Sequence, residues 1–257
     1  MAMRGVAALW WREIIRFVRQ RSRLVGAFAQ PLLFWVLLGG GFSSSLRPPG
    51  APEDLGTMAY FYPGIIGLVL LFTAIFSTIA VVEDRKSGFL QGVLVSPISR
   101  GGIVLGQALG GTTLAVLQGV LFLALAPLVG IRPTLLSVVA VVLVIAAVAF
   151  ALTSLGLVIA WRMESTQGFH AIMNLILMPI WILSGAFFPA SGAAGWLGWL
   201  MQLNPLTYGM AALRRCLYLD APAAVGRIPA LGPSLVVTLL FCGVTFAGAT
   251  AVARRSR

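Results

Sequence analysis

Residues 58–82 read Met-Ala-Tyr-Phe-Tyr-Pro-Gly-Ile-Ile-Gly-Leu-Val-Leu-Leu-Phe-Thr-Ala-Ile-Phe-Ser-Thr-Ile-Ala-Val-Val, a run of 25 residues without a charged side chain. An α-helix needs about 20 residues to cross the hydrocarbon core of a bilayer, so this run is long enough to span it. Its hydrophobicity is continuous, whereas a strand of a membrane barrel alternates between apolar and polar residues. The stretch therefore predicts a transmembrane helix.

Five more apolar runs are long enough to do the same, and the composition agrees with them. The chain is 59% hydrophobic and 10% charged, against about 25% charged in an ordinary soluble domain. Proline and glycine inside the runs are compatible with membrane helices, whose neighbours can satisfy the freed backbone groups. We predict an all-α integral membrane protein, one transmembrane domain over residues 1–257, with six spans: Leu24–Phe42, Met58–Val82, Ile103–Val129, Thr134–Trp161, Ala171–Phe188 and Ser234–Val252.

The distribution of basic residues predicts the orientation. If the N-terminus is cytoplasmic, thirteen of the 18 Lys and Arg residues lie on the cytoplasmic side. The positive-inside rule then places both termini in the cytoplasm of a multi-pass protein of the cell membrane, plasma or bacterial inner. The net charge of +11 lies in clusters at the ends of apolar runs, an arrangement that favours anionic lipid headgroups over nucleic acid as a partner.

The segments before the first span and after the fifth are not simple connectors. Residues 1–23 carry Arg12, Arg16, Arg19 and Arg23 on one helical face and apolar side chains on the other, which favours a helix lying in the membrane interface over a solvated basic arm. Arg21 falls on the apolar side, so this helix should bend or end near it. The outer loop 190–232 contains a short apolar stretch and then Asn204-Pro205, which predicts re-entrant or interfacial short helices, with Asn204 as an N-cap.

The cytoplasmic loop 83–100 has the most informative pattern. Carboxylates open it, Phe89, Val93 and Leu94 share one side at helical spacing, and Pro97 ends the segment. This pattern predicts a short helix fit to dock in a groove of a partner, although an ordinary loop helix lying on its own protein remains an alternative. The sequence of the loop is Glu83-Asp84-Arg85-Lys86-Ser87-Gly88-Phe89-Leu90-Gln91-Gly92-Val93-Leu94-Val95-Ser96-Pro97-Ile98-Ser99-Arg100.

This loop closely resembles the signature loop of ABC-2 type transporter permeases, most of all the branch of drug-resistance and nodulation-factor exporters. The resemblance covers nearly the whole chain. It departs from the family at Gln91-Gly92, where relatives usually carry a charged, stronger helix former, and Gly92 costs about 1 kcal/mol of helix propensity. The other matching motifs are Trp11-Arg12-Glu13, Gln30-Pro31-Leu32-Leu33-Phe34, Ser184-Gly185-Ala186-Phe187-Phe188-Pro189 and Asn204-Pro205-Leu206-Thr207-Tyr208-Gly209.

The resemblance implies a type V ABC exporter-like permease that pairs with a second permease, as a homodimer or a heterodimer, and engages two copies of a separate ATPase. Glu83 is expected to fix a hinge by capping a helix or by pairing with a basic residue of the connecting helix. The implied coupling residues are Glu83, Asp84, Arg85, Gly88, Phe89, Leu90, Leu94, Val95, Ser96 and Pro97, and those of the connecting helix are Trp11, Arg12, Glu13, Arg16 and Arg19.

No nucleotide-binding or catalytic motif is present in the sequence. The phosphate-binding pattern G-x-x-x-x-G-K-[ST] is absent, because the single lysine, Lys86, follows Arg85 instead of glycine. One histidine and two cysteines cannot form a His/Cys metal cluster or a disulfide framework. We therefore expect no enzymatic site, no metal and no cofactor in this chain, with ATP and Mg²⁺ bound by the partner ATPase.

The span interiors contain almost no ionisable residue, which argues against a secondary transporter coupled to protons or sodium. The apolar spans suit a hydrophobic or amphipathic cargo, such as a drug or a lipid-linked or glycolipid-like molecule. An ATP-independent channel or uniporter, a membrane scaffold and a lipid-modifying enzyme are the alternatives. Neutral polar residues could line the pathway or could simply join helices; the candidates are Gln107, Thr112, Gln118 and Asn174.

Overall fold

The computed structural model describes residues 2–41, 56–187 and 194–255, and in these ranges all regular structure is helical. The predicted all-α class is therefore confirmed. The helices are α1 (Ala2–Arg19), α2 (Arg21–Gly41), α3 (Thr57–Lys86), α4 (Phe89–Leu94), α5 (Arg100–Leu123), the 3₁₀ turn η1 (Ala126–Val129), α6 (Leu135–Ala160), α7 (Thr166–Trp181), the π turn η2 (Ile182–Ala186), α8 (Gly195–Leu203), α9 (Pro205–Leu217), the 3₁₀ turn η4 (Pro222–Val225) and α10 (Leu231–Arg255).

Within the described ranges, five helices are long and apolar enough to cross a membrane: α3, α5, α6, α7 together with η2, and α10. A chain with several such helices is a multi-pass membrane protein. The first predicted span corresponds to α2, whose apolar part is the shorter segment Phe28–Leu37. The six-span topology therefore stays a prediction, and its residue Phe42 lies outside the described residues.

Local capping explains where the helices depart from the predicted ranges. The span predicted from Ala171 begins earlier, at Thr166, because the side chain of Ser165 accepts a hydrogen bond from the backbone N–H of Gly168. The predicted span 103–129 is interrupted, since α5 ends at Leu123 and η1, with a proline in its first turn, follows. Helix α3 continues past the predicted end at Val82, so Glu83 and Asp84 form part of its last turn.

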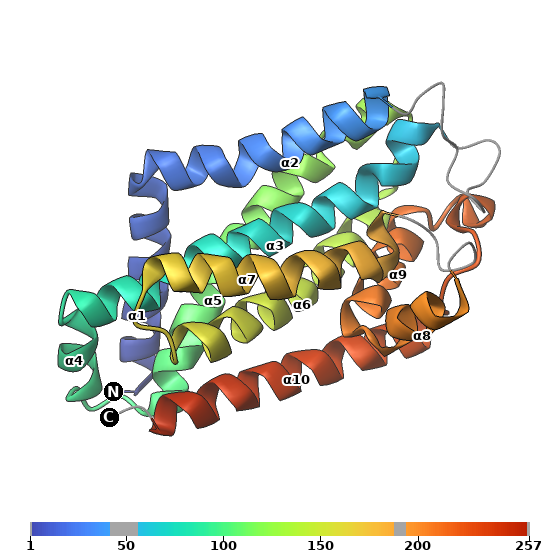
Figure 1. Cartoon of the computed structure of the whole chain (residues 1–257). Helices are drawn as coiled ribbons and strands as arrows, with labels where there is room; N and C mark the ends of the chain where they lie inside the picture. Colours follow the sequence, from blue (N-terminus) through green and yellow to red (C-terminus); the bar gives the residue numbers. More distant parts are fainter. Residues whose placement is uncertain (1, 42–55, 188–193, 256–257) are drawn as a thin grey trace.

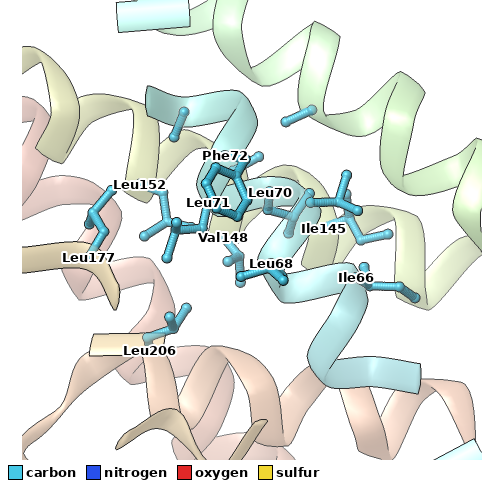
Figure 2. Close-up of a cluster of buried hydrophobic side chains, with 14 of the residues drawn as sticks. Ile66, Leu68, Leu70, Leu71, Phe72, Ile145, Val148, Leu152, Leu177 and Leu206 are labelled. Atoms are coloured by element: carbon cyan, nitrogen blue, oxygen red, sulfur yellow. The ribbon is translucent and has the colours of Figure 1, made fainter. Parts of the chain in front are cut away.

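Helix α3 is the centre of the bundle. It contacts α2, α5, α6, α7 and α9, and nearly every residue from Ala59 to Val82 is buried. Figure 2 shows leucine and isoleucine side chains of α3 packed against α6 and α7. Outer helices such as α10 are largely exposed instead, with apolar residues on their outer side. This pattern fits a bundle whose outer surface faces lipid.

The helix pair α8–α9 reaches into the bundle. Asn204 lies between the two helices, where its side chain accepts from the backbone N–H of Leu206 and donates to the carbonyl oxygen of Ile180 at 2.6 Å. Asn204 is therefore the N-cap of α9, as predicted. Leu206 is buried in the same cluster as the α3 and α6 side chains (Figure 2). Two short helices are therefore present in the predicted outer loop, and their re-entrant or interfacial placement stays a prediction. Residues 190–193 of the predicted loop lie outside the described residues.

The two ends of the bundle differ in what they carry. Both chain termini, α1 and α4 lie at one end, whereas α8 and α9 lie at the other (Figure 1). Helix α1 ends at Arg19, and α2 starts two residues later in a sharply different direction (Figure 1). The predicted break near Arg21 is confirmed. We refer below to the end with the termini as the terminal end.

Candidate functional site

Helix α1 lies directly on α5 along a row of glycines. The row consists of Gly102, Gly106 and Gly110, spaced four residues apart and therefore on one face of α5. A β-carbon at Gly106 would lie 2.9 Å from the β-carbon of Leu9, and one at Gly110 would lie 2.6 Å from the β-carbon of Glu13. Such contacts are too close for any larger side chain, so the glycines are what allow the two helices to approach.

This approach brings two arginines of α1 to the carboxylate of Asp84 at the end of α3. Arg12 donates two hydrogen bonds to Asp84, each at 2.7 Å, in a bidentate arrangement. Arg16 donates a third, at 2.6 Å. Asp84 is only 3% exposed, and a carboxylate so buried requires paired charges and hydrogen bonds. Asp84 is thus the centre of an ion-pair network that fixes α1 to α3.

Two further carboxylates complete the network. Glu83 accepts from Arg16 at 2.7 Å, so it contacts a basic residue of α1, the arrangement that the resemblance implied. Glu13 of α1 pairs with the neighbouring Arg12 at 3.1 Å. The hydrogen bond to Asp84 is the main cause that raises the pKa of Arg12. The five side chains Arg12, Glu13, Arg16, Glu83 and Asp84 form what we call the arginine–carboxylate cluster.

Helix α4 begins beside this cluster. Gly88 precedes it with φ at +76°, in the left-handed region, so the chain turns sharply after α3. The guanidinium of Arg12 lies 3.8 Å from the ring centre of Phe89, a cation–π contact. One arginine therefore contacts both the end of α3 and the first residue of α4.

The buried face of α4 differs from the predicted one. Leu90 and Val93 are buried against the protein's own core, and Leu94 is half-buried there. The apolar residues that remain on the surface are Phe89, 42% exposed, and Val95, 87% exposed. Val93 and Leu94 thus stabilise α4 on its own protein, as the loop-helix alternative proposed, while Phe89 and Val95 remain available to a partner.

The remaining coupling-loop residues fix the same end of the bundle. Arg85 donates to the carbonyl oxygens of Trp161, at 2.6 Å, and Met163, at 3.1 Å, which joins α3 to the end of α6. Ser96 donates to the carbonyl oxygen of Val93, and Pro97 is exposed beyond α4. The Arg85 bonds thus fix the end of α3 to the end of α6, whereas the Ser96 bond is local to the end of α4.

Two predicted connecting-helix residues lie outside the cluster. Trp11 is 56% exposed, and Arg19 is also exposed. Both line a shallow hollow beside Asp84 and Ser87. The exposed aromatic surfaces of Trp11 and Phe89 thus flank Arg12 at the terminal end.

The candidate pathway residues are not brought together on one surface. Gln118 is 2% exposed and its side-chain oxygen accepts from the hydroxyl of Thr73 at 2.5 Å. Gln107 is 6% exposed, Thr112 donates back to the carbonyl oxygen of Ala108, and Asn174 lies exposed on α7. The burial of the two glutamines supports the interpretation that they pack helices.

Two adjacent glycines of α5 show why the candidate pathway residues do not share one surface. Gly110 faces α1, through Glu13, whereas Gly111 faces α3 and α6, through Ser77 and Thr153. Sequence spacing places Gln107, Gly110, Gly111 and Gln118 roughly on one side of α5. In the structure this group is divided between two helix interfaces. Spacing alone could not reveal this, since it does not say which neighbour covers each side.

Comparison with known proteins agrees with this geometry. Residues 4–218 match the sequence model of the ABC-2 type transporter family. The chain belongs to the ABC-2 type transporter family. The match includes the arginine–carboxylate cluster, α4 and the α8–α9 pair, and it covers α1 except for its first two residues, so that of the helices only η4 and α10 lie beyond it.

Individual relatives of this ABC-2 permease are named as a transport permease and as nodulation proteins. It is 30% identical over 217 residues to transport permease ycf38 of Porphyra purpurea, covering 81% of this chain and 72% of that protein. It is 29% identical over 185 residues to nodulation protein J of Rhizobium leguminosarum bv. trifolii, covering 71% and 69%. With nodulation protein J of R. leguminosarum bv. viciae the identity is 25% over 252 residues, covering 96% and 93%. The family membership predicted from the coupling-loop motif is confirmed.

Proposed function

We propose that this chain is the permease subunit of an ATP-driven exporter and that α1 and α4 together receive the movement of a separate ATPase. The observation that carries the proposal is the sharing of Arg12 between Asp84, at the end of α3, and Phe89, at the start of α4. A force applied to α4 would reach α1 and α3 through one rigid, charge-assisted contact. Family membership supports a partner ATP-binding subunit in general.

The exposed side chains at the terminal end suit a protein partner. Trp11, Phe89 and Val95 are apolar and open to the surface, and they lie among arginines beyond the ends of the apolar helices. Aromatic side chains flanked by arginine are typical of the centre of protein interfaces. The ATPase would cover this surface, and its closure on ATP would move α4 and, through Arg12 and Asp84, the inner end of α3.

The proposal also covers the second permease, the orientation in the membrane, the cargo and the site of ATP binding. Two permeases would form the pathway between them, with both termini in the cytoplasm and α8–α9 on the outer side. The cargo would be hydrophobic or amphipathic, because the span interiors offer almost no fixed charge to compensate an ion. ATP and Mg²⁺ would be bound by the two ATPase subunits, and this chain would supply no catalytic group.

The test is a double substitution on the exposed side of α4. Phe89→Ala with Val95→Ala should leave the chain folded, because neither side chain belongs to the buried core. It should reduce co-purification with the ATPase and transport by the complex at least tenfold, since two apolar anchors contribute roughly 3 kcal/mol when buried. Trp199→Ala, at an aromatic residue at the opposite end that is more exposed than Phe89, is the control and should change neither. Wild-type co-purification and transport by the double variant would refute the proposal.

A further inference from the structure

A buried arginine at the end opposite the termini has no carboxylate partner among the described residues. Arg214 of α9 is 7% exposed. Its guanidinium donates to the carbonyl oxygen of Tyr60 at 3.2 Å and lies 4.6 Å from the Tyr60 ring centre. The ion pairs that the structure gives among its described residues involve Arg12 and Arg16, at the terminal end. A buried guanidinium needs more compensation than one carbonyl and one ring provide.

A second arginine faces the same small cavity. Arg214 and Arg227 both line a pocket of about 40 Å³, measured as the space open to the centre of a water molecule. That space exceeds the roughly 10–15 Å³ that one water requires. The hydroxyls of Ser184 and Thr207, which also line the cavity, donate to backbone carbonyl oxygens. The rest of the lining is Gly185, Met201, Met210, Ala211, Ile228 and Pro229, so the two arginines are its charged residues. Arg214 is buried and Arg227 is exposed, so an anion that enters the cavity from the surface would meet the positive charge of both.

The position of Arg227 is fixed by a third arginine. Arg215 donates to the carbonyl oxygens of Pro229, at 2.6 Å, and Ile228, at 2.8 Å. These bonds hold the segment that follows η4 against α9, and Arg227 directly precedes Ile228 in that segment. Arg215 thus holds the backbone of this segment, while Arg214 and Arg227 line the cavity.

We infer that this pocket, which we call the outer arginine pocket, binds the phosphate group of an anionic ligand. Guanidinium groups form paired, charge-assisted hydrogen bonds to phosphate oxygens, and two of them around one cavity match the charge of such a group. The lining residues come from η2, α8, α9 and the segment after η4. Helices α8 and α9 lie at the end of the bundle where α3 begins (Figure 1). A lipid headgroup of the outer leaflet and a free phosphate offer the same chemistry.

The experiment measures the melting temperature of the detergent-purified chain and needs neither ATPase nor transport. One arm adds inorganic phosphate against sodium chloride at equal ionic strength, and the other adds phosphatidylglycerol against phosphatidylcholine in mixed micelles. A specific ligand should raise the melting temperature by about 3 °C or more near saturation. A rise with phosphatidylglycerol alone identifies a lipid headgroup as the ligand, and a rise with phosphate as well identifies a site that takes the free anion.

Two variants and a control decide whether the pocket is responsible. Arg227→Gln, at an exposed position, should fold normally and lose the shift, and Arg214→Lys should weaken it because lysine lacks the planar guanidinium. Arg132→Gln removes an exposed arginine at the same end that does not line this pocket, and it should keep the full shift. No shift in the wild type with either ligand, or an unchanged shift in Arg227→Gln, would overturn the inference.

Discussion

Asp84 is the residue on which the terminal end depends most. Its carboxylate receives three hydrogen bonds from Arg12 and Arg16 and is almost fully buried. We expect Asp84→Asn to destabilise the fold by about 3 kcal/mol, because it removes the buried charge that Arg12 and Arg16 share and leaves each arginine with one carboxylate, Glu13 and Glu83 respectively. The matched control is Glu83→Gln, whose side chain is 30% exposed and should cost about 1 kcal/mol or less. Thermal unfolding in detergent measures both, and equal losses would contradict the central place given to Asp84.

Gln118 tests the assignment of the polar residues inside α5. Its side chain is buried and bonded to Thr73, so Gln118→Leu should cost about 1 kcal/mol of stability or less, because one hydrogen bond is lost while the Thr73 hydroxyl keeps the carbonyl oxygen of Val69. The set of exported compounds should not change. Transport assays over a panel of amphipathic compounds provide the measurement, and an altered cargo profile at normal expression would show that Gln118 lines the pathway after all.

The residue-level contacts were only partly predictable from sequence. The pairing of Glu83 with a basic residue of the N-terminal helix came from the family resemblance, and the structure has it with Arg16. The larger role of Asp84 was not predicted, because it depends on how closely α1 approaches α5. A signal was present, however: Gly102, Gly106 and Gly110 form a small-residue row of the kind that joins membrane helices.

At the scale of helices, the glycine row of α5 predicts how firmly α1 is held. Gly106→Ala should displace α1, because the new β-carbon would lie 2.9 Å from Leu9 and 3.0 Å from the carbonyl oxygen of Val6. We expect a loss of about 1–3 kcal/mol and faster tryptic cleavage at the exposed end of α1, at Arg19. Gly92→Ala is the control on α4, where no atom lies within 4 Å, and it should stabilise α4 by about 0.4–1 kcal/mol. Unchanged cleavage in Gly106→Ala would disprove the close α1–α5 contact.

Long apolar runs and capping residues made most helices predictable, since a membrane requires continuous backbone hydrogen bonding over a fixed length. The break after Arg19 and the N-cap at Asn204 were read correctly from polar residues at special positions. The orientation of α4 could not be predicted from the sequence. Spacing grouped Phe89 with Leu94, but the left-handed turn at Gly88 rotates α4 so that Leu90 and Val93 are buried. A six-residue helix has too few turns for its pattern to determine which side is covered.

For the whole molecule, the arrangement of the ends predicts the topology. Both termini and α4 lie at one end and the outer arginine pocket at the other (Figure 1). In a chain with Cys216 and Cys242 replaced by serine, Lys86→Cys should be labelled by a membrane-impermeant reagent only after lysis, and Arg227→Cys in intact cells. Both positions are exposed, so access to the reagent depends only on the side of the membrane. Labelling of Lys86→Cys in intact cells would reverse the orientation that the positive-inside rule predicts.

The most direct test of the central claim is a cross-link between α4 and the ATPase. Val95→Cys, at a position 87% exposed, is introduced into a chain in which both native cysteines are replaced. This variant is co-expressed with a series of ATPase variants, each with a single cysteine at a different surface position. We predict a disulfide-linked permease–ATPase product from Val95→Cys whose yield differs between ATP-bound and nucleotide-free complexes, while Leu203→Cys, 71% exposed at the opposite end, gives none. No product from Val95→Cys at any ATPase position, in a complex that still transports, would contradict α4 as the coupling element.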